Sequence, residues 1–225
     1  MKIGKAIVGE ILNPSIDISI DYGEVALDSI LEDGILKDVP IISTVISGVK
    51  TALAIRDKRF VKKTLVFLQE INSGHADPEK VEEFREKLMH DKSYNEKITE
   101  LIITMIDNHL QEIQSKVFAR LVISHINGEI DYEMLLTLSV TLDKLHPAGY
   151  EGLRSLDRES GSSGNISGIQ SSDFSKYGFN SMYEGLLFSA GVVTRFGTAL
   201  HVNDIGKYLY KYGIRHLYSS NTSGV

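Results

Sequence analysis

The chain of 225 residues is long enough for one large domain or two small ones. Hydrophobic residues make up 42% of it and charged residues 24%, which is typical of a folded globular protein and excludes disorder over most of its length. The net charge of −6 argues against a dedicated nucleic-acid binder, and the lack of cysteine excludes disulfides, thiolate nucleophiles and cysteine-ligated zinc or iron–sulfur sites.

The N-terminal segment is predicted to be an extended arm followed by a helix. Its apolar patch is short and is interrupted by Glu10, so it does not resemble a signal peptide and we expect an unexported, cytoplasmic protein. Residues 16–22 alternate apolar and polar side chains with period two, which is typical of a strand, but no hairpin partner follows. A helix is expected from Glu24 to Glu32, with Gly34 suited to its C-terminal end.

The next predicted helix, from Val39 to Ile55, is unusually weakly polar, because its 17 residues carry one charge, Lys50. Asp38 suits the N-terminal cap of this helix, and Pro40 suits its first turn. Small side chains recur at four-residue spacing and would permit the close approach of a second helix: Thr44, Gly48 and Ala52.

Two interpretations of this segment are open. A membrane span needs about 20 residues, and a lysine at mid-span costs about 2.5–3.5 kcal/mol, so a helix in the core of a helical domain is favoured. The alternative is peripheral contact with the inner membrane, because the basic cluster that follows could bind lipid headgroups or phosphate. The candidate contact residues are Lys50, Arg56, Lys58, Arg59, Lys62 and Lys63. The same cluster is also consistent with a solvated face that pairs with acidic helices such as residues 79–86.

From residue 56 to residue 146, apolar residues recur at three- and four-residue spacing, as in amphipathic helices. Helices are expected from Arg56 to Asn72, from Asp77-Pro78 onward, from Ser93 through Ile106, from about Ile113 to Asn127-Gly128, and from Asp131 to just before His146-Pro147. Ser93 and Glu96 form a capping-box pattern, which predicts Ser93 as the cap of the third of these helices. Residues 1–158 are therefore expected to form a helical domain with an extended N-terminal arm.

Serine and glycine dominate residues 159–172, which predicts a linker. The sequence pattern after this linker is different and predicts a small α+β, winged-helix-like module over residues 173–225. The expected elements are a helix from about Ser181 to Ala190, a hairpin over 192–202 that turns at Gly197, and a last helix capped by Asn203 or Asp204 and closed by Gly213. The predicted fold class is thus mainly α, a helical bundle followed by this module.

A winged-helix-like module raises the hypothesis of DNA binding. The helix before the hairpin would then need Arg, Lys, Asn or Gln to contact base edges. Between Ser181 and Ala190 there is no Arg or Lys, and Glu184 would face phosphate unfavourably. We therefore expect no nucleic-acid partner and favour a module that contacts protein.

No motif in the sequence indicates an enzyme. The seven histidines show no metal-ligand spacing, and Asp107 with His109 is the nearest approach to a pair. Residues 48–51 lack the Gly-Lys step of a phosphate-binding loop, and residues 161–164 do not form the G-x-S-x-G nucleophile elbow. We expect no catalytic, cofactor-binding or metal-binding residues.

Residues 27–34, Val39-Pro40, and Ile55-Arg56-Asp57 before a basic helix resemble a group of small bacterial helical proteins, with a further match at residues 126–130. The resemblance covers about the first 145 residues and implies no activity or site residues. Some of those proteins resemble components found near phage-defence genes. The leading hypothesis is a non-enzymatic bacterial protein that acts through a protein partner or self-association, as an effector or accessory protein in antiphage defence. The alternatives are a membrane-acting effector that uses Val39–Lys63 and a winged-helix DNA-binding regulator.

Overall fold

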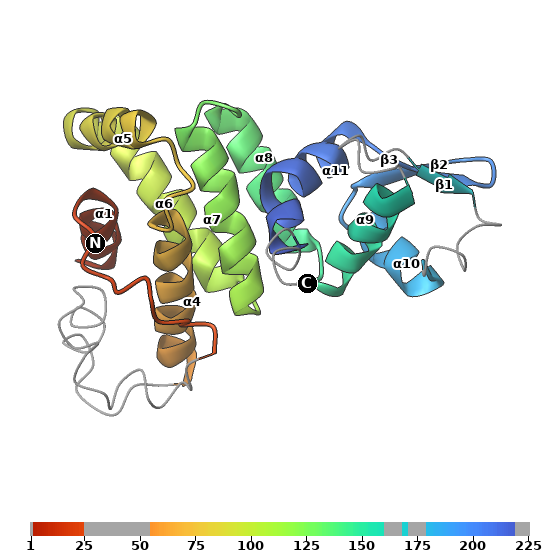
Figure 1. The fold of residues 1–225 in the computed structure, drawn as a ribbon, viewed down its shortest axis with the longest axis horizontal. Coiled ribbons are helices and arrows are strands. Elements are labelled where there is room, and N and C mark those ends of the chain that lie inside the picture. The colour runs from red at the N-terminus through yellow and green to blue at the C-terminus, as the bar shows by residue number, and fades with distance from the viewer. Residues whose placement is uncertain (1, 25–54, 160–167, 171–178, 219–225) are drawn as a thin grey trace, which may run out of the picture. The chain divides into compact units, whose positions relative to one another are not determined.

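The structure of the protein is a computed structural model. It describes residues 2–24, 55–159, 168–170 and 179–218. The predicted helices after Glu24 and between Val39 and Ile55 lie outside these residues, as do Thr44, Gly48, Lys50 and Ala52. The described chain is mainly helical, as predicted, with a small antiparallel sheet (Figure 1). It forms two compact units, Met1–Asp131 and Tyr132–Val225.

The described part of the first unit is helical. It contains α1 (Lys2–Leu12), α4 (Ile55–Ile71), α5 (Pro78–His90), α6 (Lys92–Asn108) and α7 (Glu112–Ile126). Its most extensive packing joins α4 to α7, and α4 also packs against α1 and α6 (Figure 1). The rings of Phe67 on α4 and Phe118 on α7 are both fully buried and stack with centroids 5.5 Å apart. Burying each such side chain stabilises the fold by about 1.5–3 kcal/mol.

Helices were expected in α4, α5, α6 and α7, and the structure confirms all four. The predicted start of α5 at Asp77-Pro78 is confirmed, and Asp77 caps the helix, since its carboxylate accepts hydrogen bonds from the backbone N–H groups of Glu79 and Lys80. The predicted cap of α6 is wrong: Asp91 caps this helix, with its carboxylate 2.9 Å from the backbone nitrogen of Tyr94. Ser93 lies within the first turn, because the aspartate two residues earlier already supplies the acceptor that a helix start needs.

The prediction of an extended N-terminal arm is also wrong. Residues 2–12 form α1, whose side chains Ile7, Val8 and Ile11 are buried together on one face. Residues 16–22 form turns and no strand. The carboxylate of Asp17 accepts the backbone N–H of Ser19, and the amide of Gln69 on α4 donates to the carbonyls of Ile18 and Ile20. Backbone groups that a neighbouring strand would pair are thus satisfied by side chains.

The second unit combines helices with a sheet of three short strands. Its elements are α8 (Tyr132–Lys144), α9 (Ala148–Glu159), β1 (Gly168–Gln170), α10 (Ser181–Ser189), β2 (Val193–Phe196), β3 (Ala199–Val202) and α11 (Asp204–Leu209). A π-helical turn, Tyr210–Ile214, and a 3₁₀ turn, Arg215–Tyr218, follow. The strand order is β1-β3-β2, and all pairs are antiparallel. The predicted hairpin is confirmed, with Gly197 at φ +59° between β2 and β3.

The units divide at a different place from the predicted domains. The boundary was expected at the serine- and glycine-rich residues 159–172, whereas the second unit begins at Tyr132. The reason is packing: α8 lies against α11, and α9 lies against α10 and β1. The strand β1 also falls inside the predicted linker, where it pairs with β3. Gly213 does not close the last helix, because it is buried within the π-helical turn.

Helix α9 was not predicted, because its two glycines weaken any helical pattern. Both glycines lie at close contacts between helices. A Cβ added at Gly152 would lie 2.9 Å from the Cβ of Tyr183 on α10, whereas one added at Gly149 would lie 2.7 Å from the Cδ1 of Leu145, just after α8. The glycines that obscure α9 in the sequence therefore allow close packing, at Gly152 with α10 and at Gly149 with Leu145.

A glycine on α11 gives the first testable prediction. A Cβ at Gly206 would clash with the carbonyl oxygen of Val192 and lie 2.7 Å from the Cγ1 of Val202, and backbone cannot move aside cheaply. We expect Gly206→Ala to lower the free energy of unfolding by about 2–3 kcal/mol, measured by denaturant titration. Gly185→Ala on α10 is the matched control, since nothing lies within 4 Å of an added Cβ there, and it should raise stability by up to about 1 kcal/mol. Equal effects of Gly206→Ala and Gly185→Ala on the free energy of unfolding would contradict the close packing described at Gly206.

Candidate functional site

The basic cluster predicted to contact lipid or phosphate is divided by the fold. Lys63 is buried on α4, and its Nζ donates hydrogen bonds to the carbonyl oxygens of Asp107, at 3.1 Å, and His109, at 2.6 Å. These carbonyls lie at the C-terminal end of α6, where backbone acceptors lack helical partners and the helix dipole favours a positive charge. Lys63 is therefore an internal cap of α6 and does not face solvent.

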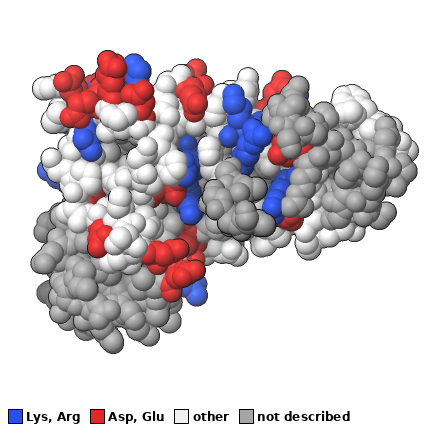
Figure 2. Space-filling model, viewed as in Figure 1, with Lys and Arg blue, Asp and Glu red and all other residues white. Residues whose placement is uncertain are grey.

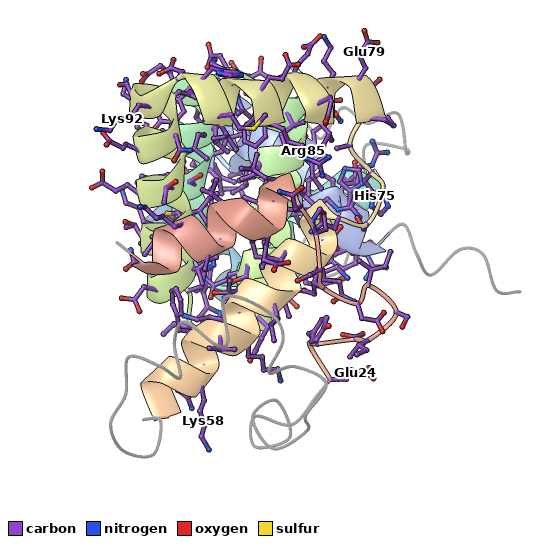
Figure 3. The ribbon with its side chains drawn as sticks, turned by 90° about the vertical axis from the view of Figure 1, so that its left-hand side faces the viewer. Glu24, Lys58, His75, Glu79, Arg85 and Lys92 are labelled. Atoms are coloured by element: carbon purple, nitrogen blue, oxygen red, sulfur yellow. The ribbon has the colours of Figure 1, made fainter. Side chains whose placement is uncertain are left out.

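The other members of the cluster are distributed differently. Lys62 Nζ lies 3.7 Å from Glu112 Oε1 on α7, while Lys58 is half-buried and Arg59 is exposed. Figure 3 shows Lys58 near the N-terminal end of α4. Arg56 belongs to α4, and Lys50 lies outside the described residues. For Lys62 the acidic partner is on α7, whereas Glu82 and Glu83 of the expected acidic helix pair with cations of α5 itself.

A buried ion cluster lies further along α4. The carboxylate of Glu70 is buried and forms an ion pair with the equally buried guanidinium of Arg120 on α7. Lys116 Nζ, one turn before Arg120, lies 3.8 Å from the second carboxylate oxygen. Removing a carboxylate from water is costly unless cations and hydrogen bonds compensate for it, and here α7 supplies two cations.

His75 and Ser73 adjoin this cluster, in the loop between α4 and α5 where Figure 3 labels His75. His75 Nε2 lies 3.3 Å from Arg120 Nη2, and because a guanidinium only donates, Nε2 must accept. The ring proton is therefore on Nδ1, which faces the Ser73 hydroxyl. That hydroxyl donates to the carbonyl of Glu70 at 2.6 Å. His75 thus has no nitrogen that could accept a proton from Ser73, and the group fastens the loop.

Burial, with Arg120 adding to it, lowers the pKa of His75 below its usual value. The ring is then neutral at pH 7, consistent with its role as an acceptor for Arg120. Beside the cluster lies a cavity of about 430 Å³ lined by Glu70, Lys116, Glu112 and Asp21, among others. Three of its carboxylates already have partners, since Glu70 pairs with Arg120, Glu112 pairs with Lys62 and Asp21 accepts the backbone N–H of Gly23. The lining therefore does not indicate a particular ligand.

His109, which the sequence placed nearest to a metal-type pair, is a core residue. Its Nδ1 lies 3.0 Å from the Ser115 hydroxyl, and its ring meets Phe118 edge to face with centroids 5.9 Å apart. Burial, with a smaller contribution from Lys63, lowers the pKa of His109 from 6.5 to about 3. A neutral ring inside the first unit is a structural feature, because nothing outside the core can reach it.

The second unit exposes large apolar side chains. On α10, Met182 is 55% exposed and Phe188 is 40% exposed, and Phe196 at the end of β2 is 70% exposed. Glu184 does not face solvent as a lone carboxylate, because it forms an ion pair with Arg195 of β2. This pair joins α10 to the hairpin, which makes the two elements neighbours. The sequence contained a signal for this surface, since residues 181–189 have apolar side chains on more sides than one buried face can accommodate.

Comparisons with protein-family models, curated proteins and solved structures found no match to the chain. Within residues 2–24, 55–159, 168–170 and 179–218, no group of three or more His, Asp or Glu side chains could hold a metal ion. Over the same residues, every helix is too short or too polar to cross a membrane. A function is therefore inferred from the surfaces and buried groups described above.

The burial of His109 gives a pH prediction. The unfolded chain binds a proton at this ring below pH 6.5 and the folded chain only below about pH 3. Stability should therefore fall as the pH drops through this window, by about 1.4 kcal/mol per pH unit from this group. His109→Asn, which keeps a polar atom near Ser115, should flatten the dependence measured by denaturant titration between pH 4 and 6.5. His90→Asn is the control, because His90 is exposed on α5. An unchanged slope of stability against pH in the His109 variant would refute the lowered pKa of His109.

Proposed function

We propose that the protein is a non-enzymatic bacterial interaction protein whose second unit binds a protein partner through α10 and the β2–β3 hairpin. The observation that carries this proposal is the exposure of Met182, Phe188 and Phe196 on two elements joined by the Glu184–Arg195 ion pair. Methionine and aromatic side chains are enriched in protein interfaces, and methionine adapts readily to a partner surface. Their exposure costs free energy that a partner would recover.

The partners of the polar groups on and beside α4 support a role without catalysis. Lys63 is held by two carbonyls, Glu70 by two cations, and the hydroxyl of Ser73 by a carbonyl. A catalytic pair needs a nucleophile or acid whose proton can pass to a neighbouring base, and these groups are already committed to one another. Their arrangement favours stabilisation of the unit over proton transfer.

The form of the second unit is part of the proposal. Its elements follow in the order helix, strand, helix, hairpin and helix, and the strand order in the sheet is β1-β3-β2. This order is consistent with a winged-helix-like arrangement. In a DNA-binding unit of this kind the helix before the hairpin would need basic or amide side chains. Since α10 instead presents Met182 and Phe188, we favour its use in protein contact. A role in antiphage defence, as effector or accessory, is proposed on the resemblance of residues 27–34 and 126–130.

The membrane alternative loses support from the division of the basic cluster. Lys63 caps α6 inside the unit, and Lys62 pairs with Glu112 on α7, so two of its members already have partners within the protein. Each lysine near an anionic membrane contributes about 1 kcal/mol to binding, so the loss of two lysines is substantial.

The test is affinity purification of the tagged full-length protein from its own cells, with quantitative mass spectrometry. Changing Met182 and Phe188 together to Glu should reduce recovery of the specific partner at least tenfold, because buried aromatic anchors contribute about 2 kcal/mol or more each. Met89→Glu is the matched control, since Met89 is a methionine on the first unit with a similar exposure of 59%. Retention of the same partner by the double variant would contradict the proposed docking surface, and turnover of nucleotide, nucleic acid or peptide by the purified protein would overturn the non-enzymatic assignment.

A further inference from the structure

Strand β2 lies at an edge of the sheet of the second unit. The strand order β1-β3-β2 gives β3 a partner on each side, whereas β2 pairs with β3 alone among the described residues. Three of the four residues of β2 are exposed, Thr194, Arg195 and Phe196, and Val193 is buried. The side of β2 that faces away from β3 is therefore open.

The register of the hairpin determines which backbone groups lie on this open side. Phe196 and Ala199 flank a two-residue turn, and residues in that position exchange hydrogen bonds with each other. Hydrogen-bonded and non-hydrogen-bonded pairs then alternate along the strands. The backbone N–H of Asn203 donates to the carbonyl of Val192 at 3.1 Å, as this alternation requires. The N–H and C=O groups of Arg195 consequently point away from β3, and they have no hydrogen-bond partner among the described residues.

Strand β2 lacks the features that usually protect an edge strand. Proline, a bulge or an outward lysine commonly prevents an edge from pairing with another chain. The sequence of β2 is Val-Thr-Arg-Phe, and its pairing with β3 is continuous, without a bulge. Its one charge, on Arg195, is neutralised by the ion pair with Glu184 of α10. Figure 2 shows uncharged side chains at the end of the hairpin, on the face that it draws. This edge is therefore a template for a further strand.

The two faces of β2 indicate which side chains an added strand would need. Successive side chains point to opposite faces, so Thr194 and Phe196 share one face, and Arg195 lies on the other face with α10. Phe196 is 70% exposed, and its ring meets that of His201 edge to face with centroids 5.5 Å apart. On the open side Phe196 occupies a non-hydrogen-bonded position, where side chains of paired strands lie closest. An aromatic or β-branched side chain at the opposite position would cover its ring.

We propose that the partner of the second unit binds as an extended strand added to the open edge of β2, with an aromatic or β-branched side chain opposite Phe196. The inference rests on the proposed protein partner of α10 and the hairpin and names the form in which that partner binds. An extended chain presents donors and acceptors at the spacing of the unpaired groups of β2. A helix bonds its own backbone groups and would leave those of Arg195 unpaired within the contact.

The experiment selects random linear peptides, displayed on phage, against the full-length protein and measures binding of the resynthesised, fluorescein-labelled peptides by anisotropy. Arg195→Pro removes the outward N–H, and an edge strand tolerates proline where the N–H faces solvent. Arg195→Ala is the matched control, because it also removes the ion pair with Glu184 but keeps the N–H. We expect Arg195→Pro to bind the peptides at least about fivefold more weakly than Arg195→Ala, since a hydrogen bond is lost and a peptide carbonyl is left unpaired.

A second measurement needs no change in the protein and so separates a lost contact from misfolding of the proline variant. Methylating the backbone nitrogens of a selected peptide one at a time should weaken binding at alternate residues, because every second N–H of an added strand faces β2. The proposal is overturned if no peptide binds, if Arg195→Pro and Arg195→Ala bind equally, or if the methylation effects do not alternate.

The fate of the proposed docking surface is read separately, by affinity purification of the natural partner. Loss of that partner on changing Met182 and Phe188 to Glu, with equal recovery by Arg195→Pro and Arg195→Ala, would retain the docking surface on α10 and overturn the added strand alone.

Discussion

The packing of α4 against α7 is the interaction on which the first unit depends. From Val61 to Ile71, α4 is buried on nearly every side, although it carries Lys63 and Glu70 within that stretch. A buried charge without partners would cost several kcal/mol, so neighbouring elements must supply them. The end of α6 supplies carbonyls for Lys63, and α7 supplies Arg120 and Lys116 for Glu70. Because these partners come from two different helices, the charges fix where α6 and α7 lie along α4.

This constraint separates the structural from the functional charges of the protein. In the sequence, the basic side chains of α4 resemble a binding surface. In the structure, some of them form contacts inside the fold instead. The second unit has the opposite character, because α10 and the hairpin expose apolar side chains. We therefore assign the contacts with other molecules to the second unit and stability to the buried charges of the first.

Sequence reasoning succeeded where apolar spacing and capping residues agreed. The helices α4, α5, α7, α8 and α10 and the hairpin at Gly197 all follow from such agreement. It failed where a tertiary contact decided the outcome. Residues 16–22 alternate like a strand, yet Gln69 satisfies their backbone, and the glycines of α9 look unfavourable until α10 is packed on them. The linker composition likewise concealed β1, which exists because β3 offers it a partner.

The burial of Lys63 could have been inferred from spacing. It lies three residues after Phe60 and four before Phe67, and so shares one helix face with these apolar residues. Interpreting the basic cluster by its charge alone obscured the position of Lys63 on this face. No sequence pattern could identify the partners of Lys63, since the carbonyls of Asp107 and His109 lie 44 and 46 residues away along the chain.

The most direct test of this account is the free energy of unfolding of Lys63→Met compared with that of Lys62→Met. Methionine keeps most of the aliphatic volume of lysine and removes the donor. The account predicts a loss of about 2–4 kcal/mol for Lys63→Met, because two carbonyls at the end of α6 lose their partner, and a loss of less than about 1 kcal/mol for Lys62→Met. A Lys63 variant as stable as the Lys62 variant would contradict the conclusion that the basic cluster of α4 is partly an internal support of the fold.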